Sequence, residues 1–305
     1  MSEENKMTTD PELERLRAEM RQMRDEAKQM RDDYARMKDE LAEERRKLDE
    51  QIAALGEKGG AWNDYLEIRG LHVEFDGFVA VKDIDLTVMH GDLRFLIGPN
   101  GAGKTTIIDA ITGLVPATGS AMFGGEQLLG RKPNDIVKLG VGRTFQTASV
   151  VEELSVVRNL QIAEGFRKKT REFFKRPDTV SQNLRDLMDI CNLTEDADKP
   201  AGILPHGKKQ WLEIGMLLAQ DAHLLLLDEP VAGMTPAERQ ATGELLRRVS
   251  RNRTVIIVEH DMEFMRQFAD SVTVLNQGQI LAEGSVEEIQ NNEEVVRIYL
   301  GGGDQ

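Results

Sequence analysis

The chain has 305 residues, a length that predicts about two domains and a buried core. It carries 53 acidic and 39 basic side chains, a formal net charge of −14, which argues against nucleic acid as its main partner. No apolar run reaches the roughly 18 residues of a membrane-spanning helix, and the N-terminus lacks the apolar core of a signal peptide. The single cysteine, Cys191, excludes an internal disulfide. These features predict a soluble protein of a reducing compartment.

Residues 1–55 carry the heptad pattern of a coiled coil. Two apolar sets alternate at spacings of three and four: Leu13, Met20, Ala27, Tyr34, Leu41, Leu48 and Leu55, and Leu16, Met23, Met30 and Met37. The flanking positions are acidic on one side of this seam and basic on the other, so opposite charges meet only between parallel helices. We therefore expect parallel self-association, with a single solvated helix as the alternative. Glycines then predict a linker over residues 56–63.

A phosphate-binding loop follows the apolar run of residues 93–97. Residues 98–105 match G-x-x-x-x-G-K-[ST] in full, and the next apolar residues have helical spacing. The glycines let backbone N–H groups turn toward phosphate oxygens, and the helix N-terminus adds partial positive charge. Lys104 is expected to bridge the β- and γ-phosphates, and Thr105 to offer its hydroxyl to Mg²⁺. The predicted phosphate-binding residues are Asn100, Gly101, Ala102, Gly103, Lys104, Thr105 and Thr106.

Two later apolar runs end in polar side chains. Residues 224–227 are four leucines, typical of a buried parallel strand, and they are followed by Asp228 and Glu229. At the carboxyl edge of an α/β sheet, Asp228 can hold Mg²⁺ and Glu229 can orient or deprotonate water. Residues 255–258 form a similar run before His260. A single histidine after a strand is more often structural, but this one is placed to reach the γ-phosphate.

With these motifs, residues 64–301 resemble the ATP-binding-cassette (ABC) ATPases, the motor subunits of ABC transporters. Residues 98–105 are similar to the Walker A motif and residues 224–229 to Walker B, which implies that Glu229 is the catalytic glutamate. His260 matches the switch histidine of that family. The resemblance implies an α/β, RecA-like P-loop fold with an α-helical subdomain inserted at about residues 147–215.

The resemblance also implies roles for two residues outside these motifs. Gln146 matches the Q-loop glutamine, which reaches Mg²⁺ and passes the nucleotide state to the membrane subunits. Phe75 matches an aromatic residue that stacks on adenine, although a strand-core role is equally compatible with the sequence. The implied catalytic set is thus Glu229, His260 and Gln146, and the implied metal set is Thr105, Gln146 and Asp228.

For the whole chain, the resemblance implies a transport ATPase that uses ATP and Mg²⁺. Its partners would be membrane-spanning permease subunits and a second cassette, which would hold it on the cytoplasmic face of the membrane. Within the group for branched-chain amino acids and urea, residues 210–220, 231–235 and 299–301 look most like a urea uptake subunit. A non-transport ABC ATPase and a coiled-coil scaffold with a regulatory nucleotide site are the alternatives.

The family's signature, Leu-Ser-Gly-Gly-Gln, departs here to Leu-Pro-His-Gly-Lys at residues 204–208. In the family this segment binds the γ-phosphate held by the opposite subunit. Pro205 has neither a hydroxyl nor an N–H, His206 is bulkier than glycine, and Lys208 offers charge as a partial substitute. With Gly207, these residues predict a weakened contribution to the partner's site. This favours pairing with an orthodox cassette, whereas the self-complementary coil favours like chains.

Overall fold

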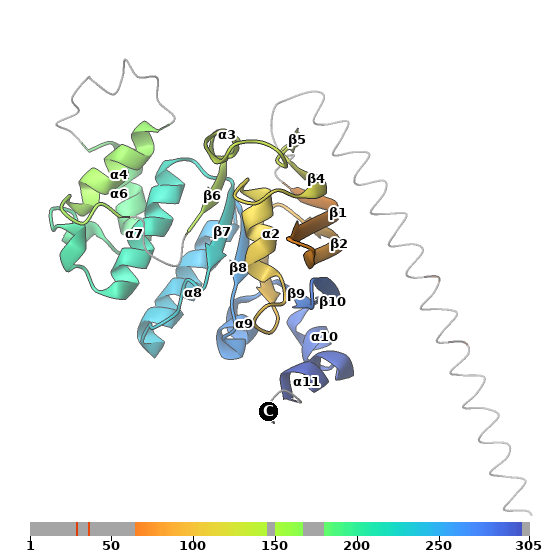
Figure 1. Cartoon of the computed structure of the whole chain (residues 1–305). Helices are drawn as coiled ribbons and strands as arrows, with labels where there is room; N and C mark the ends of the chain where they lie inside the picture. The colour runs from red at the N-terminus through yellow and green to blue at the C-terminus, as the bar shows by residue number, and fades with distance from the viewer. Residues whose placement is uncertain (1–28, 30–35, 37–64, 145–149, 167–179, 301–305) are drawn as a thin grey trace, which may run out of the picture. The chain divides into compact units, whose positions relative to one another are not determined.

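A computed structural model describes residues 29, 36, 65–144, 150–166 and 180–300 (Figure 1). The chain divides into two units, Met1–Ala61 and Trp62–Gln305, and the second unit contains all the elements named below. The predicted coil lies outside the described residues, except for Gln29 and Arg36, as do the linker and Gln146.

The centre of the second unit is a six-stranded sheet of order β10-β9-β3-β8-β7-β6. The strands are parallel except for β10, which pairs antiparallel with β9 at the edge. Their bounds are β3 (Leu93–Ile97), β6 (Val141–Arg143), β7 (Leu224–Asp228), β8 (Thr254–Val258), β9 (Ser271–Asn276) and β10 (Gln279–Gly284). The strands predicted from the three apolar runs are therefore confirmed.

Both faces of this sheet are covered, which explains why its strands read as continuous apolar runs. Every residue of β7 and β8 is buried. Side chains alternate between two cores: Phe95, Leu225 and Ile257 belong to the core that includes helices α7 (His206–Ala219), α8 (Pro236–Ser250) and α9 (Met262–Phe268). Leu96 and Leu226 belong to the other core, which includes helix α2 (Lys104–Ile111) and a second sheet.

The second sheet is antiparallel, with order β2-β1-β4-β5. Its strands are β1 (Leu66–Phe75), β2 (Phe78–Val88), β4 (Thr118–Phe123) and β5 (Glu126–Gln127). The buried residues Leu66, Ile68 and Val81 of this sheet share a core with Ile107 and Ile108 of α2 (Lys104–Ile111). This packing holds the start of α2 at the end of β3, where the phosphate loop lies.

Three of the described helices form a separate group between β6 and β7 in the sequence, at the left of Figure 1. They are α4 (Val156–Gly165), α6 (Gln182–Ile190) and α7 (His206–Ala219), and α7 packs on both of the others. Two 3₁₀ turns, Thr194–Asp196 and Ala201–Ile203, precede α7. This is the part of the chain where an inserted helical subdomain was expected; its bounds at 147–215 stay a prediction.

The remaining helices among the described residues are α3 (Pro133–Lys138), α8 (Pro236–Ser250), α9 (Met262–Phe268), α10 (Val286–Gln290) and α11 (Glu293–Leu300). Each of the two capping boxes, at Thr235 with Glu238 and at Ser285 with Glu288, begins a helix through reciprocal hydrogen bonds. Within the described ranges, no helix combines the length and apolarity needed to cross a membrane.

Candidate nucleotide site

The phosphate loop turns tightly between β3 and α2, and two of its glycines are required by close neighbours. A Cβ on Gly98 would lie 2.3 Å from the carbonyl oxygen of Leu275. A Cβ on Gly103, whose φ is +100°, would lie 2.8 Å from the carbonyl oxygen of Ala80. Gly101 has φ +77° and open space around it. The predicted strand–loop–helix context is confirmed, and the exposed Asn100 and Gly101 lie at its surface.

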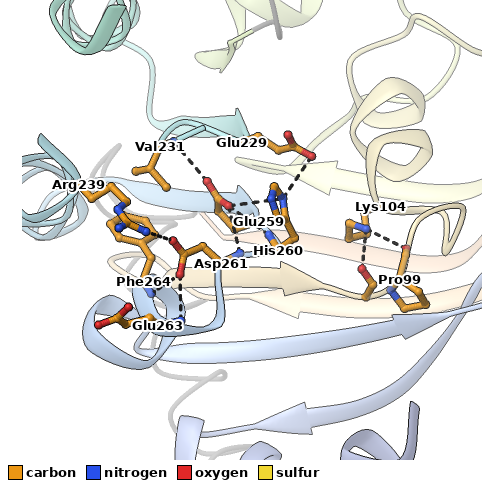
Figure 2. Close-up of polar contacts among 11 residues, drawn as sticks. Pro99, Lys104, Glu229, Val231, Arg239, Glu259, His260, Asp261, Glu263 and Phe264 are labelled. Atoms are coloured by element: carbon orange, nitrogen blue, oxygen red, sulfur yellow. Dashed lines mark hydrogen bonds and ion pairs between the residues drawn. The ribbon is translucent and has the colours of Figure 1, made fainter. Parts of the chain in front are cut away.

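Lys104 is the first residue of α2, and its side chain folds back over the loop. Its Nζ donates hydrogen bonds to the carbonyl oxygens of Gly98 at 2.7 Å and Pro99 at 3.0 Å (Figure 2). Burial lowers the pKa of Lys104, and the carboxylates of Glu229 and Asp228 oppose this decrease. The ammonium group therefore lies within electrostatic reach of two carboxylates. A phosphate group bound here would be attracted by the ammonium group and repelled by the carboxylates, so the site favours phosphate only together with a cation.

Asp228 ends β7 and is 4% exposed. The hydroxyl of Thr105 is close enough to its carboxylate to lower its pKa, and its Oδ1 is buried without a hydrogen-bond partner among the described residues. Burial raises the pKa of Asp228; the Arg143 guanidinium, with Nη2 4.0 Å from Oδ2, opposes the increase. A carboxylate oxygen with spare acceptor capacity beside a threonine hydroxyl fits Mg²⁺, which prefers oxygen ligands. The structure thus brings together Thr105 and Asp228, two of the three predicted metal ligands.

Glu229 occupies a strained turn directly after β7. Its φ is +50°, a left-handed conformation that is uncommon for residues other than glycine. Its backbone N–H donates to the carbonyl oxygen of Val258 at 2.9 Å, which attaches the turn to the end of β8. Its Oε1 lies 3.6 Å from Nδ1 of His260, and both side chains are open to solvent. Two of the three predicted catalytic side chains, Glu229 and His260, are therefore neighbours, although 31 positions separate them in the sequence.

One buried carboxylate beside this pair was not singled out from the sequence. Glu259 directly follows β8, and only 1% of it is exposed. It accepts hydrogen bonds from the backbone N–H groups of Val231, His260 and Asp261. Its position directly after a fully buried strand, like that of Glu229 after β7, is the sequence signal that identifies it.

Phe75 ends β1 and pairs in register with Phe78 across the hairpin turn. Its side chain is 41% exposed, which does not fit a strand-core residue and leaves the ring accessible. Stacking on adenine stays a prediction, as does the role of Gln146.

The unusual signature begins helix α7. Pro205 precedes the first helical residue with φ −54°, so it fits the helix start as expected. His206 Nε2 lies 3.2 Å from the carbonyl oxygen of Ala232, in the loop after β7. A Cβ on Gly207 would lie 2.8 Å from Oε1 of Glu238, so a larger residue would have to displace that side chain. Among the described residues, no hydrogen bond or ion pair joins Pro205, His206 or Gly207 to Lys104 or Asp228.

The expectation that Lys208 offers charge to phosphate is not supported by its contacts. Its Nζ forms an ion pair with the buried Asp196, which also binds Lys199 at 2.6 Å. Lys208 therefore serves the packing of its own helical group.

Comparisons with known proteins agree with this geometry. A family profile described as ABC transporter matches residues 81–232, and one described as branched-chain amino acid ATP-binding cassette transporter matches residues 279–305. BraF, a high-affinity branched-chain amino acid transport ATP-binding protein of Pseudomonas aeruginosa, is 36% identical over 249 residues, covering 77% of this chain and 97% of BraF. LivG of Escherichia coli is 35% identical over 248 residues, with 77% and 97% covered.

The fold is similar to that of a solved ABC cassette. The ATP-binding cassette of an ABC transporter, crystallised in its ADP conformation, matches with a TM-score of 0.68 and 28% identity, over 77% of this chain and 98% of that one. The predicted cassette fold is confirmed, and so are ATP with Mg²⁺ as its ligands and ATP-driven transport as its function. The chain belongs to the ATP-binding, energy-coupling subunits of ABC importers, of the type represented by LivG and BraF.

Proposed function

We propose that this ATPase drives uptake of urea or a short-chain amide, with a branched-chain amino acid as the alternative solute. The observation that carries the proposal is the sequence of residues 210–220, 231–235 and 299–301, which resembles that of a urea uptake subunit. The first two stretches are joined through Thr242: Trp211 Nε1 donates to Thr242 Oγ1 at 2.8 Å, and Thr242 Oγ1 lies 3.3 Å from Met234 Sδ. The relatives BraF and LivG are branched-chain amino acid transport proteins, and they support the alternative.

Solute uptake separates these possibilities. Cells that express the chain with its permease and binding proteins are given labelled urea or labelled leucine, and Lys104→Ala is the matched inactive variant. Lys104-dependent urea uptake supports the proposal, and Lys104-dependent leucine uptake without urea uptake contradicts it. Undiminished uptake in Lys104→Ala would favour a scaffold with a regulatory nucleotide site.

We assign the nucleotide chemistry to residues from three strand ends. Lys104 holds the β- and γ-phosphates, Glu229 orients or deprotonates the attacking water, and His260 stabilises Glu229 and reaches the γ-phosphate. Thr105 and Asp228, with Gln146 as a further ligand, would hold Mg²⁺, which would neutralise phosphate charge. The 3.6 Å approach of His260 to Glu229 supports this division of roles.

The permease partner is proposed to dock at a cavity of about 280 Å³ between the segment after α2, α3, β6 and α7. Leu114 and Phe166, which are 47% and 49% exposed, give it an apolar rim. Arg143 lines the cavity and approaches Asp228, so a permease segment here would lie one side chain from the metal ligand. Docking at this place would hold the chain on the inner face of the membrane.

A substitution in the rim tests the docking site. Leu114→Asp is expected to abolish co-purification with the permease while leaving MgATP binding unchanged. Val296→Asp, at a similarly exposed apolar position of α11 outside the cavity, is the control and should leave the complex intact. Co-purification of the Leu114→Asp chain would rule out this cavity.

The N-terminal arm is proposed to join two copies of the chain through a parallel coil of residues 1–55, connected by residues 56–63 to a cassette of residues 64–301. The heptad spacing and the sign of the flanking charges support it. Native mass measurement of the full chain and of a chain lacking residues 1–55 tests it. An unchanged stoichiometry would contradict self-association through the arm.

The Pro205 signature is proposed to make the two ATP sites of a heterodimer unequal. The site built on Lys104 and Glu229 would be closed by an orthodox partner and hydrolyse ATP, whereas the site closed by Pro205 would hydrolyse slowly. Replacing the catalytic glutamate of each subunit in turn tests this, and equal losses of ATPase activity would contradict it. In a homodimer, Pro205→Ser should instead raise turnover.

A further inference from the structure

A buried carboxylate lies between the two loops that carry Glu229 and His260. Oε1 of Glu259 accepts a hydrogen bond from the backbone N–H of Val231 at 3.3 Å. Oε2 accepts from the N–H groups of His260 at 3.1 Å and Asp261 at 3.4 Å. Each oxygen therefore holds a different loop, and Figure 2 shows the side chain spanning them.

These contacts favour the carboxylate form of Glu259. An ionised carboxyl accepts on both oxygens with all its lone pairs, whereas a protonated one gives up part of this acceptor capacity to its O–H group. Burial raises the pKa of Glu259, and the three backbone hydrogen bonds oppose the increase. The side chain is 1% exposed, and its nearest ring nitrogen, His260 Nδ1, lies 4.0 Å from Oε2. A charge buried this completely is unfavourable unless its hydrogen bonds are all retained.

The loop after β7 is also held from its other side. The carbonyl oxygen of Ala232 lies 3.2 Å from Nε2 of His206, which donates to it in the tautomer protonated at that nitrogen. The N–H of Glu229 donates to the carbonyl oxygen of Val258. The loop of residues 229–232 is thus attached to the signature segment, to strand β8 and to Glu259.

We propose that Glu259 is a positioning residue that fixes the loops of residues 229–232 and 259–261 relative to each other. By doing so it sets the approach of His260 to Glu229, and it links that pair through Ala232 to the signature segment. Glu259 acts through these neighbours and does not itself contact nucleotide. This inference rests on the catalytic roles proposed for Glu229 and His260.

The Glu259→Gln variant tests the proposal. Glutamine has one accepting oxygen and one donating amide, so it can satisfy only one of the two loops. In the full-length chain assembled with its permease, we expect kcat for ATP hydrolysis to fall by about ten-fold or more, with Kd for MgATP within about two-fold of wild type. The binding constant should hold because the phosphate loop lies outside these contacts.

Two control variants separate positioning from loss of charge and loss of stability. Glu263→Gln removes an exposed carboxylate from the first turn of α9. Ile256→Val removes one methylene group from the buried part of β8 and lowers the melting temperature without touching either loop. Both should keep the wild-type kcat. A wild-type kcat in Glu259→Gln, or an equal loss in Ile256→Val, would overturn the inference.

A measurement on the wild-type chain makes the test independent of whether the variant folds. The amides of Val231, His260 and Asp261 lie in loops but should exchange hydrogen at least about ten-fold more slowly than the amide of Gly125, in the open turn between β4 and β5. Fast exchange at all three would overturn the inference. Absence of ATPase activity in the wild-type complex would instead overturn the proposed function.

Discussion

His260 and Glu229 follow different strands, yet Nδ1 of His260 lies 3.6 Å from Oε1 of Glu229. The two strands, β7 and β8, are parallel neighbours in register, with Asp228 opposite Val258, so their carboxyl ends meet at one edge of the sheet. Both side chains are accessible to solvent, so a water molecule can bind beside them and be activated.

The first prediction concerns this pair. His260→Ala should lower kcat for ATP hydrolysis by about 10²-fold because the carboxylate loses its neighbour, while MgATP binding stays near the wild-type value. Steady-state hydrolysis and equilibrium nucleotide binding measure the two effects. His223→Ala, at a half-buried histidine near Asp221, is the control and should keep full activity. Equal kcat values in the two variants would remove His260 from the mechanism.

The second prediction concerns the phosphate loop. Gly103→Ala places a Cβ 2.8 Å from the carbonyl oxygen of Ala80 at φ +100°, and should cost about 1–3 kcal/mol of stability and greatly weaken ATP binding. Gly125→Ala has a similar φ of +78° but open space, so it should cost only about 1 kcal/mol and leave binding intact. Urea unfolding and nucleotide titration compare them, and equal effects on binding would contradict the steric argument.

The third prediction concerns the pH dependence of stability. Hydrogen bonds and charge from Lys199 and Lys208 lower the pKa of Asp196 below its ordinary value of 3.8. Because the folded pKa is depressed, the stabilisation is full above about pH 4 and is lost as the pH falls through the folded pKa. Asp196→Asn should therefore cost about 1–3 kcal/mol at neutral pH and progressively less below that range.

Urea unfolding at several pH values measures this difference. Asp198→Asn, an exposed position in the same turn, is the control and should change stability by less than about 0.5 kcal/mol. A loss for Asp196→Asn that stays constant down to acid pH would contradict the ion-pair account.

The fourth prediction concerns the only cysteine. Burial raises the pKa of Cys191 to about 12, and 1% of the residue is exposed. The thiol should resist a disulfide reagent at about pH 8 in the folded chain, because the thiol is not ionised at this pH and the reagent cannot reach its sulfur. One equivalent should react after unfolding in guanidinium chloride. Rapid reaction of the folded chain would show that the contact between α6 and α7 opens.

Several features could be predicted from sequence because they are local. The strands β3, β7 and β8 are buried on both faces and therefore read as apolar runs, and the glycine pattern of the phosphate loop reflects short-range backbone geometry. The hairpin of β9 and β10 follows from its turn residues, Gln277 and Gly278, both with positive φ.

Other features depend on contacts between distant segments. Lys208 contacts Asp196 only because a 3₁₀ turn packs against the start of α7. The sequence does not show this contact, so it predicts instead that the charge of Lys208 is available to phosphate. Glu259 can join two loops only because it accepts a hydrogen bond from Val231, which follows a different strand. Neither partner can be identified from spacing alone, since each depends on how separate elements pack.

The central claim is that ATP hydrolysis at Glu229 drives solute import. The most direct test measures ATP hydrolysis and solute uptake together in proteoliposomes that contain the complete transporter, with the wild-type chain and with Glu229→Gln. The account predicts that the variant binds MgATP but loses hydrolysis and uptake together, by about 10²-fold or more. Uptake that continues at the wild-type rate in Glu229→Gln would contradict it.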